Sequence, residues 1–305
     1  MEHIVSALIP IFLLILLGYL FKRIKFPSND FWASADKLTY YVLMPSLLIY
    51  KLSTASLEGL DAVDFVLTGI LGIFAVLFIN LVINIKTTTS GASFSSVVQG
   101  ALRFNTYVYL ALITAIFGDE GIALAALLIT FAIPLINVIC ITIFAVFVNE
   151  QKATFRGMIK SIITNPLILA CLIGGGINYI DFTLPLIALN LLKILSASAL
   201  PMGLLSIGFA LDLSSVKEAK SELLLSSFLK LFIMPLLAFF IGNYYELNTL
   251  LLAIVVIFAS MPTAPSSFIL ARQLGGDTKL MASIITFQTL LSVLSLSILL
   301  GLLAL

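Results

Sequence analysis

The chain has 305 residues, of which 61% are hydrophobic and 10% are charged, and its net charge at pH 7 is +1. A soluble domain is about 45–50% apolar and about 25% charged, so the composition excludes a soluble globular protein. The small net charge and the scattered basic residues argue against nucleic-acid binding. The mean hydropathy of +1.19 indicates an integral membrane protein.

Ten apolar segments follow one another along the chain, and a bilayer-spanning helix needs about 20 such residues. The first segment runs directly into Lys22 and Arg23 without a small-residue cleavage site, so it predicts a spanning helix and not a signal peptide. No connection exceeds about fifteen residues, so no attached soluble domain is predicted. The segments are 3–21, 36–53, 62–85, 92–117, 121–148, 157–179, 185–211, 221–243, 248–272 and 279–304.

Lysine and arginine fix the predicted orientation, because cytoplasmic loops carry an excess of both. With the N-terminus outside, the inner connections carry twelve basic residues and the outer ones only Lys51 and Lys193. Both termini are therefore predicted to be non-cytoplasmic, and the even number of spans agrees. The twelve inner residues are Lys22, Arg23, Lys25, Lys37, Lys86, Lys152, Arg156, Lys160, Lys217, Lys220, Arg272 and Lys279.

Prolines and glycines recur at a shift of 156 or 157 residues, which indicates an internal repeat; the alternative is coincidence in a chain with ten prolines. We predict a first five-helix repeat over 1–150 and a second over 151–305. An odd number of spans gives the two repeats opposite orientations, as in many secondary transporters. The recurring pairs are Pro10 with Pro166, Gly18 with Gly174, Pro45 with Pro201, and Gly118 with Gly275.

The segment 248–272 is predicted to be a broken helix, because Pro262 and Pro265 each remove a backbone donor and clash with the preceding turn. A break within a bilayer is tolerated only where it is buried in protein or lines a cavity. Thr263, Ser266 and Ser267 supply hydroxyls that either cap the broken ends or contact a solute.

The repeat predicts a second break, since a shift of 156 residues back from Pro262 reaches Thr106, next to Asn105. Asparagine competes with helical backbone hydrogen bonds, and its amide both donates and accepts. Arg103, about 16 Å into its span, either reaches the interface by snorkelling or faces a cavity or partner. Paired interrupted helices point to a transporter's binding site.

Seven residues are the predicted solute-binding set, and Pro262 and Pro265 are the predicted helix-breaking residues. Unpaired N–H groups at a half-helix N-terminus after the prolines would favour a carboxylate. Asn137 either lines the same cavity or packs between helices. For Lys230, the favoured interpretation is that its side chain snorkels to the membrane interface. Gly203, Ser206 and Gly208 together form a pattern that is typical of a small-residue stripe for helix packing. The seven residues are Asn105, Thr106, Arg103, Thr263, Ser266, Ser267 and Asn137.

Other chemistry is not indicated. No Asp or Glu lies in the middle of a span, and no nucleotide-binding loop occurs. Cys140 and Cys171 fall in apolar segments and are predicted to be buried hydrophobes. His3 is the single histidine. Neither an enzyme, a cofactor nor a metal site is predicted.

Four stretches, in this order, resemble the auxin efflux carrier family, which includes plant PIN-type auxin exporters and bacterial malonate or malate permease-like proteins. The resemblance implies that spans 4 and 9 cross, with an anionic solute held there, and it implies elevator-like movement and a homodimer. The chain differs from these relatives in two places. PIN-type members have a proline where this chain has Phe104, and the long cytoplasmic loop of some plant members is reduced here to about 149–156. The stretches are 103–121, 165–170, 200–208 and 261–277.

From these patterns we expect an all-α membrane protein of ten helices that works as an efflux carrier for a small organic anion, such as a carboxylate or an auxin-like acid. It would lie in the lipid bilayer of a bacterial-type inner membrane, with a proton, sodium or the membrane voltage as the driving force. Two alternatives stay open: a sodium-coupled organic-anion symporter of the bile-acid-transporter type, and a membrane sensor that uses the same pocket without transport.

Overall fold

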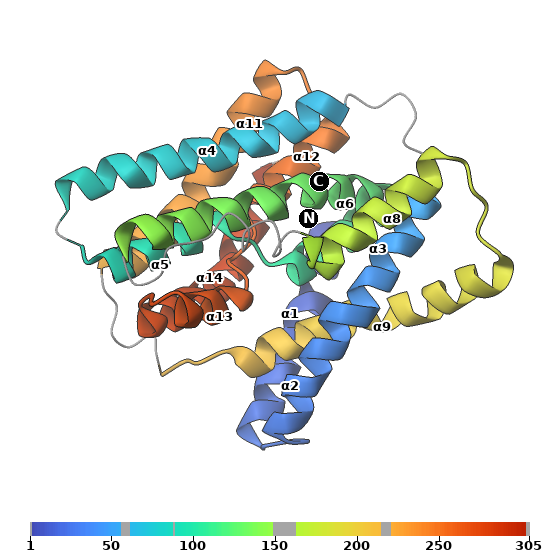
Figure 1. Cartoon of the computed structure of the whole chain (residues 1–305), viewed down its shortest axis with the longest axis horizontal. Helices are drawn as coiled ribbons and strands as arrows, with labels where there is room; N and C mark the ends of the chain where they lie inside the picture. The colour runs from blue at the N-terminus through green and yellow to red at the C-terminus, as the bar shows by residue number, and fades with distance from the viewer. Residues whose placement is uncertain (1, 56–61, 88, 149–162, 215–220, 303–305) are drawn as a thin grey trace. The chain divides into compact units, whose positions relative to one another are not determined.

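The computed structural model describes residues 2–55, 62–87, 89–148, 163–214 and 221–302, and every regular element in these residues is a helix (Figure 1). Helix occupies each of the ten predicted segments as far as the structure describes them. The connection 149–156, the beginning of segment 157–179 and the basic residues Lys160, Lys217 and Lys220 lie outside the described residues. Five described stretches are long and apolar enough to cross a membrane: Ala62–Lys86, Gly91–Phe147, Leu186–Ala210, Ser221–Tyr244 and Thr278–Leu302.

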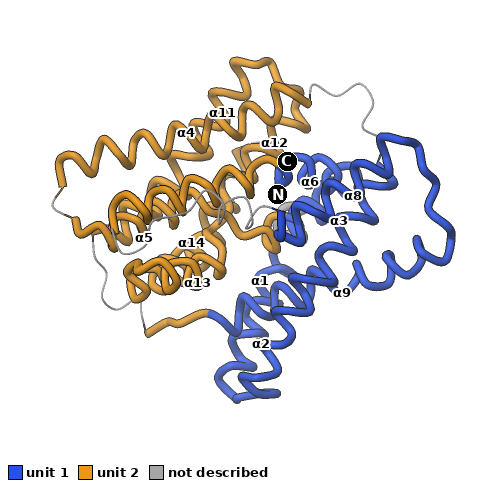
Figure 2. The backbone as a smooth tube through the Cα atoms, in the orientation of Figure 1, with its two compact units in different colours: residues 1–60, 110–130, 160–210 blue, residues 61–109, 131–159, 211–305 orange. Residues whose placement is uncertain are grey.

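The chain divides into two compact units, and each is drawn from both halves of the sequence (Figure 2). Unit 1 comprises residues 1–60, 110–130 and 160–210, and unit 2 comprises residues 61–109, 131–159 and 211–305. The predicted repeats, 1–150 and 151–305, therefore each contribute to both units.

Unit 1 is held together by close contact between its first and last helices. A Cβ atom on Gly18 would lie 2.0 Å from the carbonyl oxygen of Leu205, and one on Gly208 would lie 1.8 Å from that of Ile15. Only glycine permits such an approach of two helix backbones, so the packing role predicted for Gly208 is confirmed. The helices of unit 1 are α1 (Glu2–Arg23), α2 (Asn29–Leu38), η1 (Thr39–Leu43), α3 (Met44–Ser53), residues 110–130 of α6 (Thr106–Phe147), α8 (Pro166–Tyr179) and α9 (Leu186–Ala210).

Unit 2 packs α5 against α10 and α14, and α11 against α4 and α12. Its core includes Val97, Leu223, Met281 and Ile284, all buried. The helices of unit 2 are α4 (Ala62–Lys86), α5 (Gly91–Leu102), the first four residues of α6 and its second part from residue 131, α10 (Ser221–Phe228), η3 (Leu229–Ile233), α11 (Met234–Tyr244), α12 (Thr249–Ala259), α13 (Ser266–Gln273) and α14 (Thr278–Leu302).

Two short π-helical turns interrupt segments that the sequence predicts as regular helix. η1 and η3 each end directly before a Met-Pro pair, Met44-Pro45 and Met234-Pro235. Proline has no N–H, and its ring clashes with the carbonyl of the preceding turn. A wider π turn at this point accommodates the ring, and such turns are frequent at functional sites.

Two glycines change the direction of the chain at the predicted ends of segments 92–117 and 248–272. Gly118 interrupts α6 with φ 61° and ψ −143°, and Gly275, between α13 and α14, has φ 75°. Positive φ is accessible to glycine at little cost, so this residue type is required at both corners.

Candidate functional site

The first interruption separates α5 from α6 at Arg103, Phe104 and Asn105. Asn105 has extended backbone angles and is the N-cap of α6, where its Oδ1 accepts hydrogen bonds from Tyr107 N at 3.1 Å and Val108 N at 3.3 Å. These bonds satisfy N–H groups that a helix start leaves unpaired. By capping the start of α6, the side chain of Asn105 stabilises an interruption of the helix at a position without a proline.

The second interruption runs from Ser260 to Pro265, between α12 and α13, and contains both predicted helix-breaking prolines. Thr263 and Ser267 are fully buried, and their hydroxyls lie 3.1 Å apart in a mutual hydrogen bond. Ser266 is exposed at the first turn of α13. The unpaired N–H groups predicted after the prolines are not found at Ser267 or Phe268, because each donates to a carbonyl of the preceding turn.

The two interruptions meet within unit 2. The backbone N–H of Asn105 donates to the carbonyl oxygen of Pro262 at 2.8 Å. Next to this bond, the rings of Phe104 and Phe258 pack with their centroids 4.6 Å apart. We call the residues 103–105 and 260–265 together the junction.

Two buried glutamines hold the junction to its neighbours. Gln99 donates to the carbonyl oxygen of Ser267 at 3.0 Å. Gln288 accepts from Thr263 N at 2.9 Å and donates to the carbonyl oxygen of Gly100 at 3.2 Å. Both side chains are fully buried. Gln288 satisfies backbone groups next to the breaks, and Gln99 ties α5 to the first turn of α13. The sequence did not predict this role, because the partners lie on other elements, 168 residues from Gln99 and 25 and 188 residues from Gln288 along the chain.

One donor at the junction has no partner. Asn105 is 1% exposed, and its Nδ2 makes no hydrogen bond in the described part of the chain. The two bonds accepted by Oδ1 fix which end of the amide is the nitrogen. A buried unsatisfied donor costs about 1–3 kcal/mol, and a ligand oxygen at this position would offset that cost.

The junction also carries a positive charge. The guanidinium of Arg103 donates to Gln99 Oε1 at 3.4 Å and to Ser266 Oγ at 3.3 Å, so it contacts residues on both sides of the junction. Of the two interpretations of Arg103, the geometry favours the one in which it serves the junction and not the interface. Thr106, the first residue of α6, is half-buried at the positive end of that helix.

Asn137 is a predicted site residue that lies apart from the junction along the chain and has no hydrogen bond to it in the described residues. It is half-buried in the second part of α6, three residues after Pro134, and no described junction residue bonds to it. The cysteines are free and buried, as predicted. No group of three His, Cys, Asp or Glu side chains able to hold a metal occurs in the described residues.

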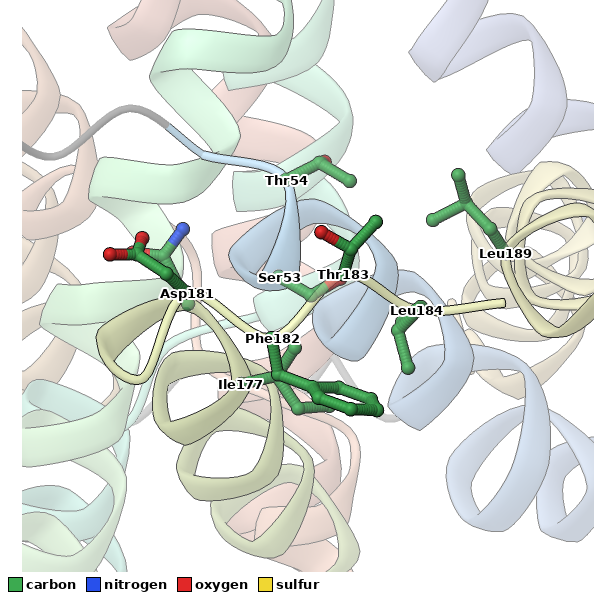
Figure 3. Close-up of a pocket in the computed structure, with 9 residues that line it drawn as sticks. Ser53, Thr54, Ile177, Asp181, Phe182, Thr183, Leu184 and Leu189 are labelled. Carbon is green, nitrogen blue, oxygen red and sulfur yellow. The ribbon is translucent and has the colours of Figure 1, made fainter. Parts of the chain in front are cut away.

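Unit 1 contains a pocket of a different character (Figure 3). Its volume is about 230 Å³, and its lining includes Ser53, Thr54, Asn178, Asp181 and Thr183. The described lining residues include no lysine or arginine, while Asp181 adds a carboxylate. A small anion would be repelled there, so the junction in unit 2 is the better candidate for an anion.

Comparison with known proteins identifies the family. The model of the family described as "Membrane transport protein", Mem_trans, matches residues 3–300. A protein of Rhizobium meliloti named "Putative malonate transporter" is 25% identical over 309 residues, which cover 96% of this chain and 93% of the relative. A protein of Methanothermobacter thermautotrophicus named "Uncharacterized transporter" is 26% identical over 302 residues, which cover 97% of this chain and 95% of the relative. The chain therefore belongs to the Mem_trans family, the auxin efflux carrier family that its motifs resemble, and is an integral membrane transporter and not an enzyme.

Proposed function

We propose that the protein is a secondary carrier that moves a small carboxylate anion outward across a bacterial-type inner membrane. The unpartnered amide Nδ2 of Asn105, buried at the junction, is the observation that carries this proposal. The name of the Rhizobium meliloti relative makes malonate the first anion to test.

The carboxylate would be held at the junction by donors of unequal strength. Asn105 Nδ2 would donate the central hydrogen bond, with the positive end of α6 and the guanidinium of Arg103 stabilising the negative charge. The hydroxyls of Thr106 and Ser266 would take part at the edge, and those of Thr263 and Ser267 would hold the second break in shape. Asn137 would line the path and not bind directly.

The proposed architecture is ten spanning helices in two inverted repeats, 1–150 and 151–305, whose fourth and ninth spans cross at the junction. Two features support it beyond the recurring prolines. The interruptions at 103–105 and 260–265 are joined by a backbone hydrogen bond, and the corresponding Gly118 and Gly275 both have positive φ. Broken helices at equivalent positions of two inverted repeats mark the solute site in transporters of this layout.

Transport would proceed by elevator-type alternating access, with unit 2 carrying the solute and unit 1 as the scaffold. The candidate donors Asn105, Arg103 and Ser266 all belong to unit 2. Such movement needs a site complete within one unit, and the hydrogen bonds of the junction are made inside unit 2. We propose in addition that both termini are non-cytoplasmic and that the carrier is a homodimer.

The test is counterflow of radiolabelled malonate in proteoliposomes. The variant Asn105→Asp keeps the oxygen that caps α6 but replaces the donor by an acceptor that repels an anion. Counterflow should be saturable in the wild type and at least tenfold slower in Asn105→Asp, while the thermal stability stays close to that of the wild type.

A matched control is available in unit 1. Asn165 caps α8 with the same pair of bonds, to Leu167 N at 3.0 Å and Ile168 N at 3.3 Å. Asn165→Asp should leave counterflow unchanged. Binding without flux in the wild type would favour a sensor, and flux that collapses when choline replaces sodium would favour a sodium-coupled symporter. Equal counterflow in Asn105→Asp and the wild type would refute the proposed site.

A further inference from the structure

Lys230 is a fully buried lysine in the η3 turn of unit 2. The sequence favours snorkelling to the interface, and this interpretation is wrong, because the side chain is 0% exposed within the protein. Among the buried residues that the structure describes, Lys230 is the only Lys, Arg, Asp or Glu. Lys230 also lies in a π turn, and such turns are frequent at functional sites.

No carboxylate of the described residues forms an ion pair with Lys230. Nζ lies 3.2 Å from the sulfur of Met234 and 5.8 Å from the ring centroid of Phe258. The ion pair found in the described residues is elsewhere, between Lys51 and Asp119 in unit 1. An isolated ammonium in apolar surroundings is costly, and a lysine there is uncharged unless an anion compensates it.

The neighbouring elements bring no titratable partner to Lys230. Helices α5, α10, α11 and α14 pack against η3. Their titratable or charged residues are Glu222, Tyr244, Lys279 and, at the end of α5, Arg103. Glu222 bonds to Ser221, Arg103 bonds to Gln99 and Ser266, and Tyr244 and Lys279 are exposed. Helix α12 carries no charged residue.

Lys230 is connected to the junction through aromatic rings. The ring of Phe258 faces Nζ, and the same ring packs against Phe104, the residue directly before Asn105. The ring centroids of Tyr109 and Phe258 are 5.8 Å apart, and the hydroxyl of Tyr109 donates to the carbonyl oxygen of Ile254 at 3.4 Å. Aromatic rings stabilise a cation only partly, so a charged Lys230 would need an anion, which a solute bound at the junction would supply.

We propose that Lys230 is the proton-coupling group of the carrier, which rests on the proposed function. When a carboxylate binds at the junction, a proton from the same aqueous side forms an N–H bond with the Nζ lone pair, and the ammonium compensates the bound anion. When the anion leaves on the other side, this N–H bond breaks and the proton leaves with it. One proton thus moves with each anion, so a monocarboxylate crosses without net charge and a dicarboxylate with one negative charge.

The test uses three variants of the full chain. Lys230→Met replaces the amine by an apolar side chain of similar size, which a buried site tolerates. Lys230→Arg keeps a charge that cannot be released. Lys279→Met removes an exposed lysine from the same unit and is the control.

The first measurement is calorimetry of malonate binding in detergent, in two buffers with different protonation enthalpies at neutral pH. The wild type and Lys279→Met should take up one proton per malonate, and both Lys230 variants should take up none. In proteoliposomes with a trapped pH dye, malonate uptake by the wild type should carry protons inward. Lys230→Arg should retain malonate exchange but lose net uptake, since its empty form keeps a buried charge.

Proton uptake of zero in the wild type, or full proton uptake in Lys230→Met, would overturn the proposal. If malonate binds and moves but no proton accompanies it, the role of Lys230 fails and the carrier function stands. If no carboxylate binds or moves, the carrier function fails and the proposal fails with it.

Discussion

Replacing Gln288 by leucine should destabilise unit 2 without changing its packing volume greatly. The amide of Gln288 bonds to Thr263 N at 2.9 Å and to the carbonyl oxygen of Gly100 at 3.2 Å. Leucine removes both bonds and leaves two buried backbone groups next to chain breaks, where no helical partner exists. Each such group costs about 1–3 kcal/mol, so the free energy of unfolding should fall by about 2–6 kcal/mol.

The assay is equilibrium unfolding in mixed detergent micelles, followed by circular dichroism. Gln99→Leu removes one backbone partner, the bond to Ser267 O, and should cost about half as much. Gln273→Leu, at an exposed position of α13, is the control and should stay within about 0.5 kcal/mol of the wild type. A loss below about 1 kcal/mol for Gln288→Leu would refute the reasoning, since hydrogen bonds between membrane helices average only about 0.6 kcal/mol where other partners are available.

Four further substitutions test the fold. Gly118→Ala and Gly275→Ala should each lower the unfolding free energy by about 1–3 kcal/mol, because both glycines have positive φ; Gly72→Ala, with open space around the added Cβ, should not. Gly208→Ala should lower the melting temperature, since its Cβ would lie 1.8 Å from a backbone oxygen of α1; an unchanged melting temperature would show that α1 and α9 are not so close. Lys230→Met should raise the unfolding free energy by about 1–4 kcal/mol because it removes a buried uncompensated amine, and a lowered value would contradict the burial.

The helices could be predicted from the sequence because their signal is local. Long apolar segments give the positions of the helices, and Pro262 and Pro265 place the second break. The first break could be found only through the repeat, since Asn105 without a proline is a weak local signal. The positive φ of Gly118 and Gly275 agrees with the correspondence that the sequence suggested.

The features that the sequence did not predict depend on residues far apart in the chain. The burial of Lys230 results from the packing of α5, α10, α11 and α14 around η3, and snorkelling is the reasonable interpretation when only its own segment is considered. The roles of Gln99 and Gln288 depend on backbone groups of other elements, which lie at or next to the second break and at the end of α5. The division into two units follows tertiary contacts that no local pattern reports.

The central claim is that the junction in unit 2 binds the carboxylate of the solute. Cryo-electron microscopy of the protein saturated with malonate tests it directly. The predicted result is a carboxylate about 3 Å from Asn105 Nδ2, beside the bond from Asn105 N to Pro262 O. Malonate bound elsewhere with Asn105 unoccupied, or residues 92–117 and 248–272 as two continuous helices that do not touch, would contradict the claim.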